Sequence, residues 1–201
     1  MSQALIVIDV QNDFCPDGRL AVPDGDAVVA PINALMREFE TVILTQDWHP
    51  AGHSSFATSH PNKAAFEMIE MPYGPQVLWP DHCVQGTEGA QFHPDLQLKA
   101  DMILRKGFRP MIDSYPGFFE NDQTTPTGLE GYLRNRGISD VILVGLATDF
   151  CVAYTALDAA RLGFRVRVEL DACRAIDLDG SLDKALTEMR AAGVQLTTGP
   201  S

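Results

Sequence analysis

The sequence predicts an α/β protein of three layers, in which a parallel β-sheet lies between two layers of helices. The first observation is that short apolar, β-branched segments alternate with helical patterns along most of the chain. The second is that these segments are apolar almost throughout, as expected of strands buried on both faces. The third is that two helical patterns end at a glycine, Gly137 and Gly163, where helices commonly stop. Elements in this order imply right-handed crossover connections.

Strands are expected at 4–10 (ALIVIDV), 41–47 (TVILTQD), 101–106 (DMILRK), 140–146 (DVILVGL), 165–170 (RVRVEL) and 194–198 (VQLTT). Helices are expected at 26–40, 127–136, 149–162 and 181–192. Pro31 lies inside the first helical pattern, so that helix should start late or kink. The segment from Trp48 to Ala100 is rich in Pro, Gly, His and Ser and is too long for a simple connection. We expect it to be an ordered functional excursion of a single domain spanning residues 1–201.

Composition and charge restrict the partners and the location. The chain has 201 residues, 45% of them hydrophobic and 21% charged, as in an ordinary globular protein. Its net charge of −12 disfavours binding to nucleic acid or to anionic membranes, and no apolar run approaches the roughly 20 residues of a membrane span. The N-terminus lacks signal-peptide features, and the four cysteines form no CxxC pair. We expect a cytoplasmic protein with free thiols, either a monomer or a homo-oligomer.

Chemically capable residues recur where the predicted strands end. Asp9, Asp47 and Lys106 lie at the ends of three strands, and Cys151 follows a fourth after a tight turn. In open α/β sheets, ligands bind at this carboxyl edge. Each residue alone has a plain structural explanation, such as a turn, a solvated strand end or a core position. Their shared position at one edge favours a functional site.

Cys151 can be a buried apolar residue, a metal ligand, half of a disulfide or a nucleophile. Thr148 is a good N-cap residue, which would place Cys151 in the first turn of a helix. Unpaired backbone N–H groups and the positive end of the helix dipole meet there. Such a setting can lower a thiol pKa from its usual value of about 8.5. The same N–H groups could hold an oxyanion, as acyl transfer requires.

A second cluster of residues has the character of a metal site. Asp47 and His49, two residues apart, can converge on one ion, and His82 could supply a third ligand from the long excursion. Imidazole and carboxylate ligands suit Zn²⁺, Fe²⁺ or Mn²⁺. His53 is either a fourth ligand or a hydrogen-bond partner of a ligand. The alternative is that these histidines only pack against loop prolines, and the setting of His82 in LWPDHCVQGT argues against it.

Five motifs, taken in order, resemble those of one known family. They are IDVQNDFC, DWHPAGHSSF, WPDHCVQGTEGAQFHP, LRKGFRPMIDSYPGF and VGLATDFCVAYTALDA. With them the chain is similar to the nicotinamidases of the isochorismatase-like hydrolase superfamily, over essentially its whole length. The resemblance implies a six-stranded parallel sheet between helical layers. It also implies hydrolysis of nicotinamide to nicotinate and ammonia in NAD salvage, with pyrazinamide as a further substrate.

The same resemblance assigns roles to residues that match the family motifs. It implies a catalytic triad (Asp9, Lys106 and Cys151), metal ligands (Asp47, His49 and His82, with His53 in some members), an oxyanion hole (the N–H groups of Ala147 and Cys151, beside a cis peptide at Leu146–Ala147) and pocket residues (Phe14, Leu20, Trp79 and Tyr115). Phe14 and Trp79 match aromatic walls around the pyridine ring. One divalent ion is implied, zinc first. Phe150, where some relatives carry histidine, and the longer loop around Tyr115 depart from the pattern.

Three other readings compete with this one. Isochorismatase-type members generally lack the nucleophilic cysteine, and carbamoyl-amide hydrolases usually lack the metal ligands, whereas this sequence has both sets. A redox or peroxide sensor using Cys151 would want a resolving cysteine, for which Cys15 and Cys83 are candidates. A binding module without activity is disfavoured, because the whole triad is present.

Overall fold

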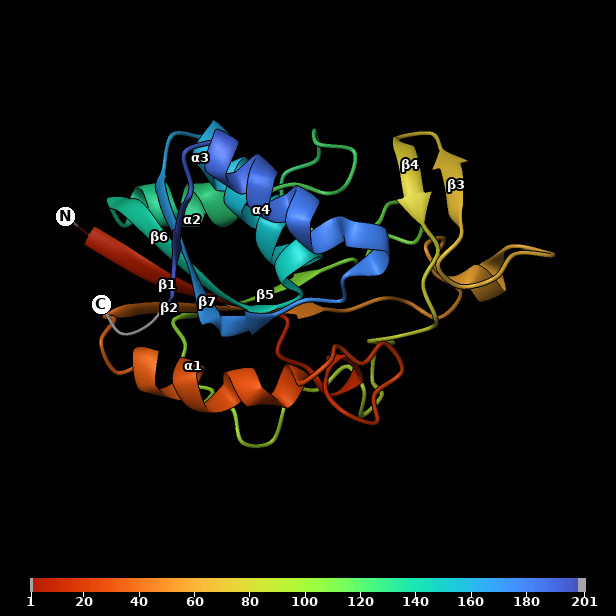
Figure 1. Ribbon diagram of the computed structural model, residues 1–201, viewed down its shortest axis with the longest axis horizontal. Helices are drawn as coiled ribbons and strands as arrows, with labels where there is room; N and C mark the ends of the chain where they lie inside the picture. Colours follow the sequence, from red (N-terminus) through yellow and green to blue (C-terminus); the bar gives the residue numbers. More distant parts are fainter. Residues whose placement is uncertain (1, 199–201) are drawn as a thin grey trace.

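A six-stranded parallel sheet forms the middle layer of the molecule (Figure 1). The computed structural model describes residues 2–198. The strands are β1 (Ser2–Ile8), β2 (Thr41–Asp47), β5 (Met102–Lys106), β6 (Ile138–Leu146), β7 (Arg165–Arg174) and β8 (Gln195–Thr197). They are parallel throughout, in the order β5-β2-β1-β6-β7-β8. The predicted three-layer α/β fold with a six-stranded parallel sheet is confirmed.

Helices cover both faces of this sheet. In Figure 1, α1 (Val29–Leu35) lies on one face, and α2 (Leu129–Asn135), α3 (Ala153–Arg161) and α4 (Ser181–Ala191) lie on the other. The strand β1 shows why the sheet needs both layers. Its Leu5 and Val7 belong to the core beneath α1, whereas Ile6 and Ile8 belong to the core beneath the other helices. Apolar side chains on both sides of a strand are what the continuous apolar runs predicted.

The long excursion between β2 and β5 is ordered and contains a feature that the sequence did not predict. Within it, β3 (Met68–Met71) and β4 (Gly74–Val77) pair as an antiparallel hairpin, which stands apart from the main sheet in Figure 1. A short 3-10 turn, Ala57–Ser59, precedes the hairpin. Both strands have only four residues, which leaves little periodicity from which to predict them.

The helices begin and end differently from their predicted ranges. The first pattern divides into a 3-10 turn at Gly25–Val28 and the helix α1, which ends at Leu35 rather than at residue 40. Pro31 is the third residue of α1, where its missing N–H leaves no hydrogen bond unmade. Further 3-10 turns lie at Asn12–Phe14 and Leu178–Gly180.

No helix among residues 2–198 is both long enough and apolar enough to cross a membrane.

Gly145 allows two central strands to meet closely at their carboxyl ends. Its φ is +116°, and a Cβ atom there would lie 2.1 Å from the carbonyl oxygen of Ile8. Gly145 pairs with Ile8 across β6 and β1. Because Asp9 follows Ile8, the close contact helps to set the position of the first candidate site residue.

Candidate active site

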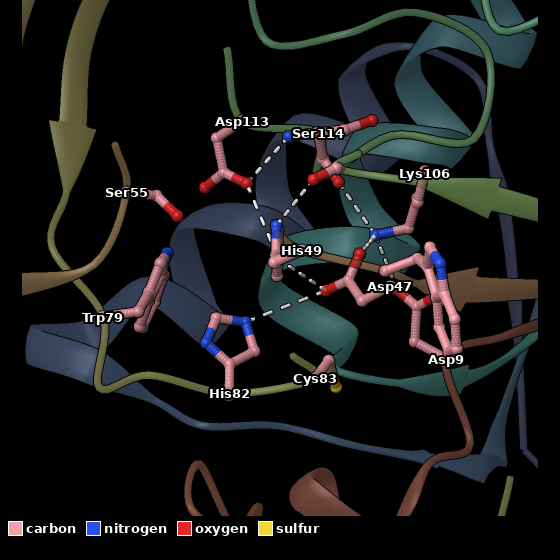
Figure 2. A network of polar contacts seen from close by, with 12 residues as sticks. Asp9, Asp47, His49, Ser55, Trp79, His82, Cys83, Lys106, Asp113 and Ser114 are labelled. Atoms are coloured by element: carbon pink, nitrogen blue, oxygen red, sulfur yellow. Dashed lines mark hydrogen bonds and ion pairs between the residues drawn. The ribbon is translucent and has the colours of Figure 1, made fainter. Parts of the chain in front are cut away.

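The polar residues predicted at the edge of the sheet do meet in one place. Asp9 follows β1, Asp47 and Lys106 end β2 and β5, and Cys151 lies in the turn after β6. Asp47 and Lys106 are paired residues of neighbouring strands. The sheet register therefore brings their side chains together, and Figure 2 shows Asp9 reaching the same lysine.

The Lys106 ammonium group is the centre of this cluster. Its Nζ atom lies 2.8 Å from Asp9 Oδ2 and donates a hydrogen bond of 2.8 Å to the Ser114 carbonyl oxygen. It also forms an ion pair with Asp47 Oδ1, and Cys151 Sγ is 3.6 Å away. Burial lowers the pKa of Lys106, but the two carboxylates outweigh it and raise that pKa well above its ordinary value. The lysine thus stays charged, and it links the candidate triad to a candidate metal ligand.

Burial also controls the acid–base chemistry of Asp9 and Cys151. It raises the pKa of the Asp9 carboxyl to about 6, against the opposing effect of Lys106. It raises the pKa of the Cys151 thiol well above its ordinary value, again against Lys106. The lowered thiol pKa expected from a helix N-terminus was wrong, because loss of water disfavours the thiolate more than the local charges favour it. The resting thiol is protonated and needs a base, and Asp9 is ionised near neutral pH.

The turn that carries Cys151 differs from a capped α-helix. Residues Thr148–Val152 form a π-helical turn, and α3 begins after it at Ala153. The capping position belongs to Ala147, and no side chain makes a cap hydrogen bond, so the expectation that Thr148 caps the helix was wrong. The carbonyl oxygen of Ala147 accepts hydrogen bonds from the N–H groups of Phe150 and Val152, both 3.1 Å. The peptide bond between Leu146 and Ala147 is cis.

Asp47, His49 and His82 form a set of donors around one point. The Nε2 atoms of His49 and His82 lie 3.6 and 3.8 Å from Asp47 Oδ2, as Figure 2 shows. Tetrahedral ligands about 2.1 Å from a zinc ion would be about 3.4 Å apart. In each ring the other nitrogen is occupied: Nδ1 of His49 donates to the Gly107 carbonyl (2.9 Å), and Nδ1 of His82 donates to the Pro80 carbonyl (2.8 Å). Each Nε2 lone pair therefore faces the carboxylate, as in a metal site.

The electrostatics of this set favour a bound cation. Burial, with a further contribution from His49, lowers the pKa of His82 to about 4, so His82 is a neutral imidazole that can donate its lone pair. Burial also lowers the pKa of His49, but Asp47 and Asp113 outweigh burial and raise it. Positive charge is thus stabilised at the point where the three side chains meet. The donor set fits a divalent ion.

His53 is held by hydrogen bonds to protein groups at both of its ring nitrogens. Its Nε2 atom donates to the Arg109 carbonyl oxygen at 2.8 Å, and its Nδ1 atom lies 2.8 Å from Ser55 Oγ. Both ring nitrogens therefore have protein partners, while a ligand atom of His53 also lies within 4.8 Å of ligand atoms of His49 and Asp113. The ring centroid of His53 lies 4.5 Å from that of His49. Of the two roles left open for His53, the geometry favours support of His49 over direct ligation.

Gly107 packs directly against the imidazole ring of His49 and leaves no room for a side chain at its own position. A Cβ atom on Gly107 would lie 2.4 Å from Cε1 of His49, and the φ of Gly107 is +68°. We expect Gly107→Ala to displace the imidazole and to weaken metal binding at least about tenfold, as loss of a group that orients a ligand typically does. Titration with Zn²⁺ in the presence of a competing chelator would measure this. Gly52→Ala is the matched control, because Gly52 has a similar φ of +72° and its Cβ would meet nothing within 4 Å. Equal zinc affinity in the two variants would contradict the prediction.

A small, tight cavity of about 20 Å³ opens onto both groups of residues. It is lined by Phe14, Leu20, Asp47, Trp79, His82, Asp113, Tyr115, Ala147, Phe150, Cys151 and Ile176. All four predicted pocket residues are among them. The rings of Trp79 and Phe150 are nearly perpendicular (86°) with centroids 5.0 Å apart, so the aromatic residues form a packed wall. The cavity lies between the Cys151 thiol and two members of the donor set, Asp47 and His82.

Asp113 is a residue of the site that the sequence analysis did not single out. It is 2% exposed, lines the cavity, and its Oδ1 atom lies 4.0 Å from His49 Nε2. Its carboxylate accepts hydrogen bonds from the Ser114 N–H and from Gln76 Nε2, both 2.8 Å. The residue belongs to the loop around Tyr115, where the only signal was an acidic residue beside a predicted pocket position.

The triad of cysteine, lysine and aspartate lies at the carboxyl edge of an α/β sheet, beside the Asp-His-His donor set. This combination is typical of cysteine hydrolases with a three-layer α/β fold. The chain belongs to the isochorismatase family, because the Isochorismatase domain matches residues 3–201. A nicotinamidase of Acinetobacter baylyi is 56% identical over 193 residues, which cover 96% of this chain and 90% of that protein.

Solved structures agree with this membership. A nicotinamidase/pyrazinamidase of Acinetobacter baumanii superimposes with a TM-score of 0.97 at 56% identity, covering 98% of this chain and 96% of that one. A pyrazinamidase of Pyrococcus horikoshii, solved in complex with zinc, has a TM-score of 0.80 at 36% identity, covering 99% and 100% of the two chains.

Proposed function

We propose that this protein hydrolyses nicotinamide to nicotinate and ammonia, as a cysteine amidohydrolase with one bound divalent ion. The observation that carries the proposal is that one cavity is lined by the Cys151 thiol and by two members of the Asp-His-His donor set, Asp47 and His82. The names of the relatives, nicotinamidase and pyrazinamidase, support the same substrate class. Pyrazinamide, a diazine carboxamide of the same size, is proposed as a second substrate.

In the first half of the reaction, Asp9 accepts the proton of the Cys151 thiol, and Sγ attacks the carboxamide carbon. Lys106 stays charged and offsets the negative charge of the acid and the thiolate. The N–H groups of Ala147 and Cys151 are proposed to stabilise the oxyanion that forms on the carbonyl oxygen. The C–N bond then breaks, and ammonia leaves with the proton that Asp9 returns. A thioester to Cys151 remains.

In the second half, water replaces ammonia and the steps run in reverse order. Asp9 accepts a proton from the water, whose oxygen attacks the thioester carbon. The C–S bond breaks, and the thiolate of Cys151 recovers its proton from Asp9. The product is nicotinic acid, which becomes nicotinate by losing its carboxyl proton to solvent. The same base and the same oxyanion donors therefore serve both halves, and the overall reaction consumes one water for each ammonia released.

Asp47, His49 and His82 would hold the ion, since their donor atoms converge and each imidazole is fixed through its other nitrogen. When bound, the ion supplies a Lewis acid for the pyridine nitrogen and for the hydrolytic water. Zinc is proposed first, because the Pyrococcus relative was solved with it, and Fe²⁺ or Mn²⁺ suit the same donors.

Phe14 and Trp79 are proposed to hold the two faces of the pyridine ring, with Leu20 and Tyr115 closing the pocket.

The free state of the four cysteines supports a reducing compartment such as the cytoplasm.

A direct assay tests the proposed function. Metal-loaded protein is incubated with nicotinamide, ammonia release is measured, and the acid product is identified by mass spectrometry. Benzamide, which has the same shape but no ring nitrogen, should be a poor substrate if the ion holds that nitrogen. Absence of ammonia from nicotinamide in protein with a full complement of zinc would refute the proposal.

The metal assignment predicts which histidines matter. We expect His49→Ala and His82→Ala to lose bound metal, because each removes a donor, and His53→Ala to lose much less. Metal content measured by plasma mass spectrometry and nicotinate affinity measured by calorimetry should fall together.

His93→Ala is the control for these variants, since Nδ1 of His93 accepts a hydrogen bond from the Asp95 N–H outside the site. Metal-free protein that keeps full activity and full nicotinamide affinity would contradict the metal assignment. It would place the protein with the metal-independent amidohydrolases of the superfamily.

A further inference from the structure

Gln76 is a buried polar residue next to the cavity with no part in the proposed reaction. It lies on β4 of the antiparallel hairpin and is only 1% exposed. A buried amide needs partners for all of its hydrogen-bonding groups. Its partners include Asp113 and Tyr115, both of which line the cavity. The hairpin is thereby connected to the wall of the site.

The orientation of the Gln76 amide is determined by its neighbours. Oε1 accepts hydrogen bonds from the Tyr73 hydroxyl and from Asn121 Nδ2, both 3.2 Å. At the opposite end, the two N–H groups of Nε2 are shared among three oxygens. One is the Tyr115 hydroxyl, 2.7 Å away, and the other two can only accept: Asp113 Oδ2 and the carbonyl oxygen of Val77, both 2.8 Å away. A flipped amide would set oxygen against oxygen at both of these contacts. The N–H groups of Gln76 therefore point towards the cavity wall.

The Tyr115 hydroxyl oxygen lies within hydrogen-bond distance of two donor nitrogens, and it shares the N–H groups of one of them, Gln76 Nε2, with Asp113 and Val77. Gln76 Nε2 lies 2.7 Å from it, and Nε1 of Trp79 lies 2.9 Å from it. Neither nitrogen can accept a hydrogen bond, so the phenol oxygen is the acceptor in both contacts. With its oxygen accepting in both contacts, this hydroxyl can form a further hydrogen bond only by donating its own proton. No hydrogen bond shown by residues 2–198 has that hydroxyl as its donor, and Tyr115 lines the cavity.

We propose that Gln76 is a positioning residue, which together with Trp79 occupies the acceptor side of the Tyr115 hydroxyl and leaves its proton to be donated to the bound pyridine carboxamide or carboxylate. Tyr115 is then a specificity-determining donor rather than only an aromatic wall. Trp79 cannot donate to the ligand, because its single N–H is committed to Tyr115. The proposal rests on the proposed function for the identity of the ligand, and on the hydrogen-bond geometry alone for the role of Gln76.

A double-mutant cycle tests this linkage. Tyr115→Phe keeps the ring and removes only the hydroxyl, and Gln76→Met keeps the side-chain length and removes the amide. We expect Tyr115→Phe to weaken nicotinate binding about three- to tenfold, the usual effect of one hydrogen bond. The fall in kcat/KM for nicotinamide should come mainly from KM. In the Tyr115→Phe background, Gln76→Met should add less than about a twofold change, because residues that act as one unit are not additive.

Two results of the cycle would overturn the proposal. One is unchanged nicotinate affinity in Tyr115→Phe. The other is an effect of Gln76→Met that is undiminished in the Tyr115→Phe background, which would assign the role of Gln76 to Asp113 instead. Gln76→Leu serves as a second variant that removes the N–H donors without adding a charge beside Asp113, and it should behave as Gln76→Met does.

A spectroscopic measurement separates this inference from the proposed function. The indole N–H resonance of Trp79, told apart from that of Trp48 by a Trp48→Phe variant, reports on the hydrogen bond to Tyr115. We expect Gln76→Met to shift this resonance in protein without ligand, and to leave it nearly unchanged when Tyr115 is already Phe. A shift would support the role of Gln76 even if nicotinamide were not a substrate. No shift in Gln76→Met would refute that role even in an active nicotinamidase.

Discussion

Replacing Cys151 with alanine should lower nicotinamide turnover by at least about 10⁴-fold and leave the fold intact. The reason is that no other group in the cavity can form the thioester, and loss of a nucleophile removes most of the catalysis in comparable enzymes. Steady-state ammonia release from metal-loaded protein measures the effect. The buried side chain shrinks by little more than one sulfur atom, so thermal unfolding should change only modestly.

Cys173→Ala is the matched control. Like Cys151, Cys173 is a buried cysteine (3% exposed), but it packs in the core and lines no part of the cavity. It should retain close to the full rate. A thiol alkylator should label Cys151 first, with nicotinate protecting it. Full activity in Cys151→Ala would exclude covalent catalysis at this residue, and labelling mainly at Cys173 would argue against it.

Lys106→Met should lose both stability and turnover. From the sequence alone, this variant would be a folded protein with nearly intact metal content. The structure changes that expectation, because the ammonium pairs with Asp47 as well as with Asp9. Removing it leaves two buried carboxylates without their cationic partner, which typically costs about 3–5 kcal/mol in the free energy of unfolding. Turnover should fall about 10²–10⁴-fold, the range of an acid–base group.

Chemical denaturation of metal-free and metal-loaded protein would measure the stability change. A bound divalent ion should offset part of the loss, since it balances the charge of Asp47. Adding Asp9→Asn to Lys106→Met should recover some stability but no activity. Lys63→Met is the surface control, because Lys63 pairs with Glu67 in an exposed position and should matter by less than about 0.5 kcal/mol. Wild-type stability and rate in Lys106→Met would show that the lysine is not needed for charge balance.

The parts of the fold predicted correctly are those with a local cause. The strand ending at Asp47 was predicted to the residue, since β-branched and apolar residues run without interruption from Thr41 to Thr45. The β3–β4 hairpin was missed, because four-residue strands in a polar excursion carry too little pattern. The capping role predicted for Thr148 was also wrong. Residue type alone cannot show that the backbone here forms a π-helical turn, in which Thr148 is the first residue and Ala147 holds the capping position.

Residue type and spacing along the chain were enough to predict the six-stranded α/β fold, the family, and the set of polar residues at the carboxyl ends of the strands. The protonation states and side-chain orientations of those residues depend instead on the tertiary structure. It turned His53 towards the Arg109 carbonyl, placed Asp113 in the cavity lining and Gln76 behind that lining, and reversed the expected shift of the Cys151 thiol pKa. The physical reason is that desolvation and hydrogen-bond direction depend on neighbours far away in the chain, which no local pattern specifies.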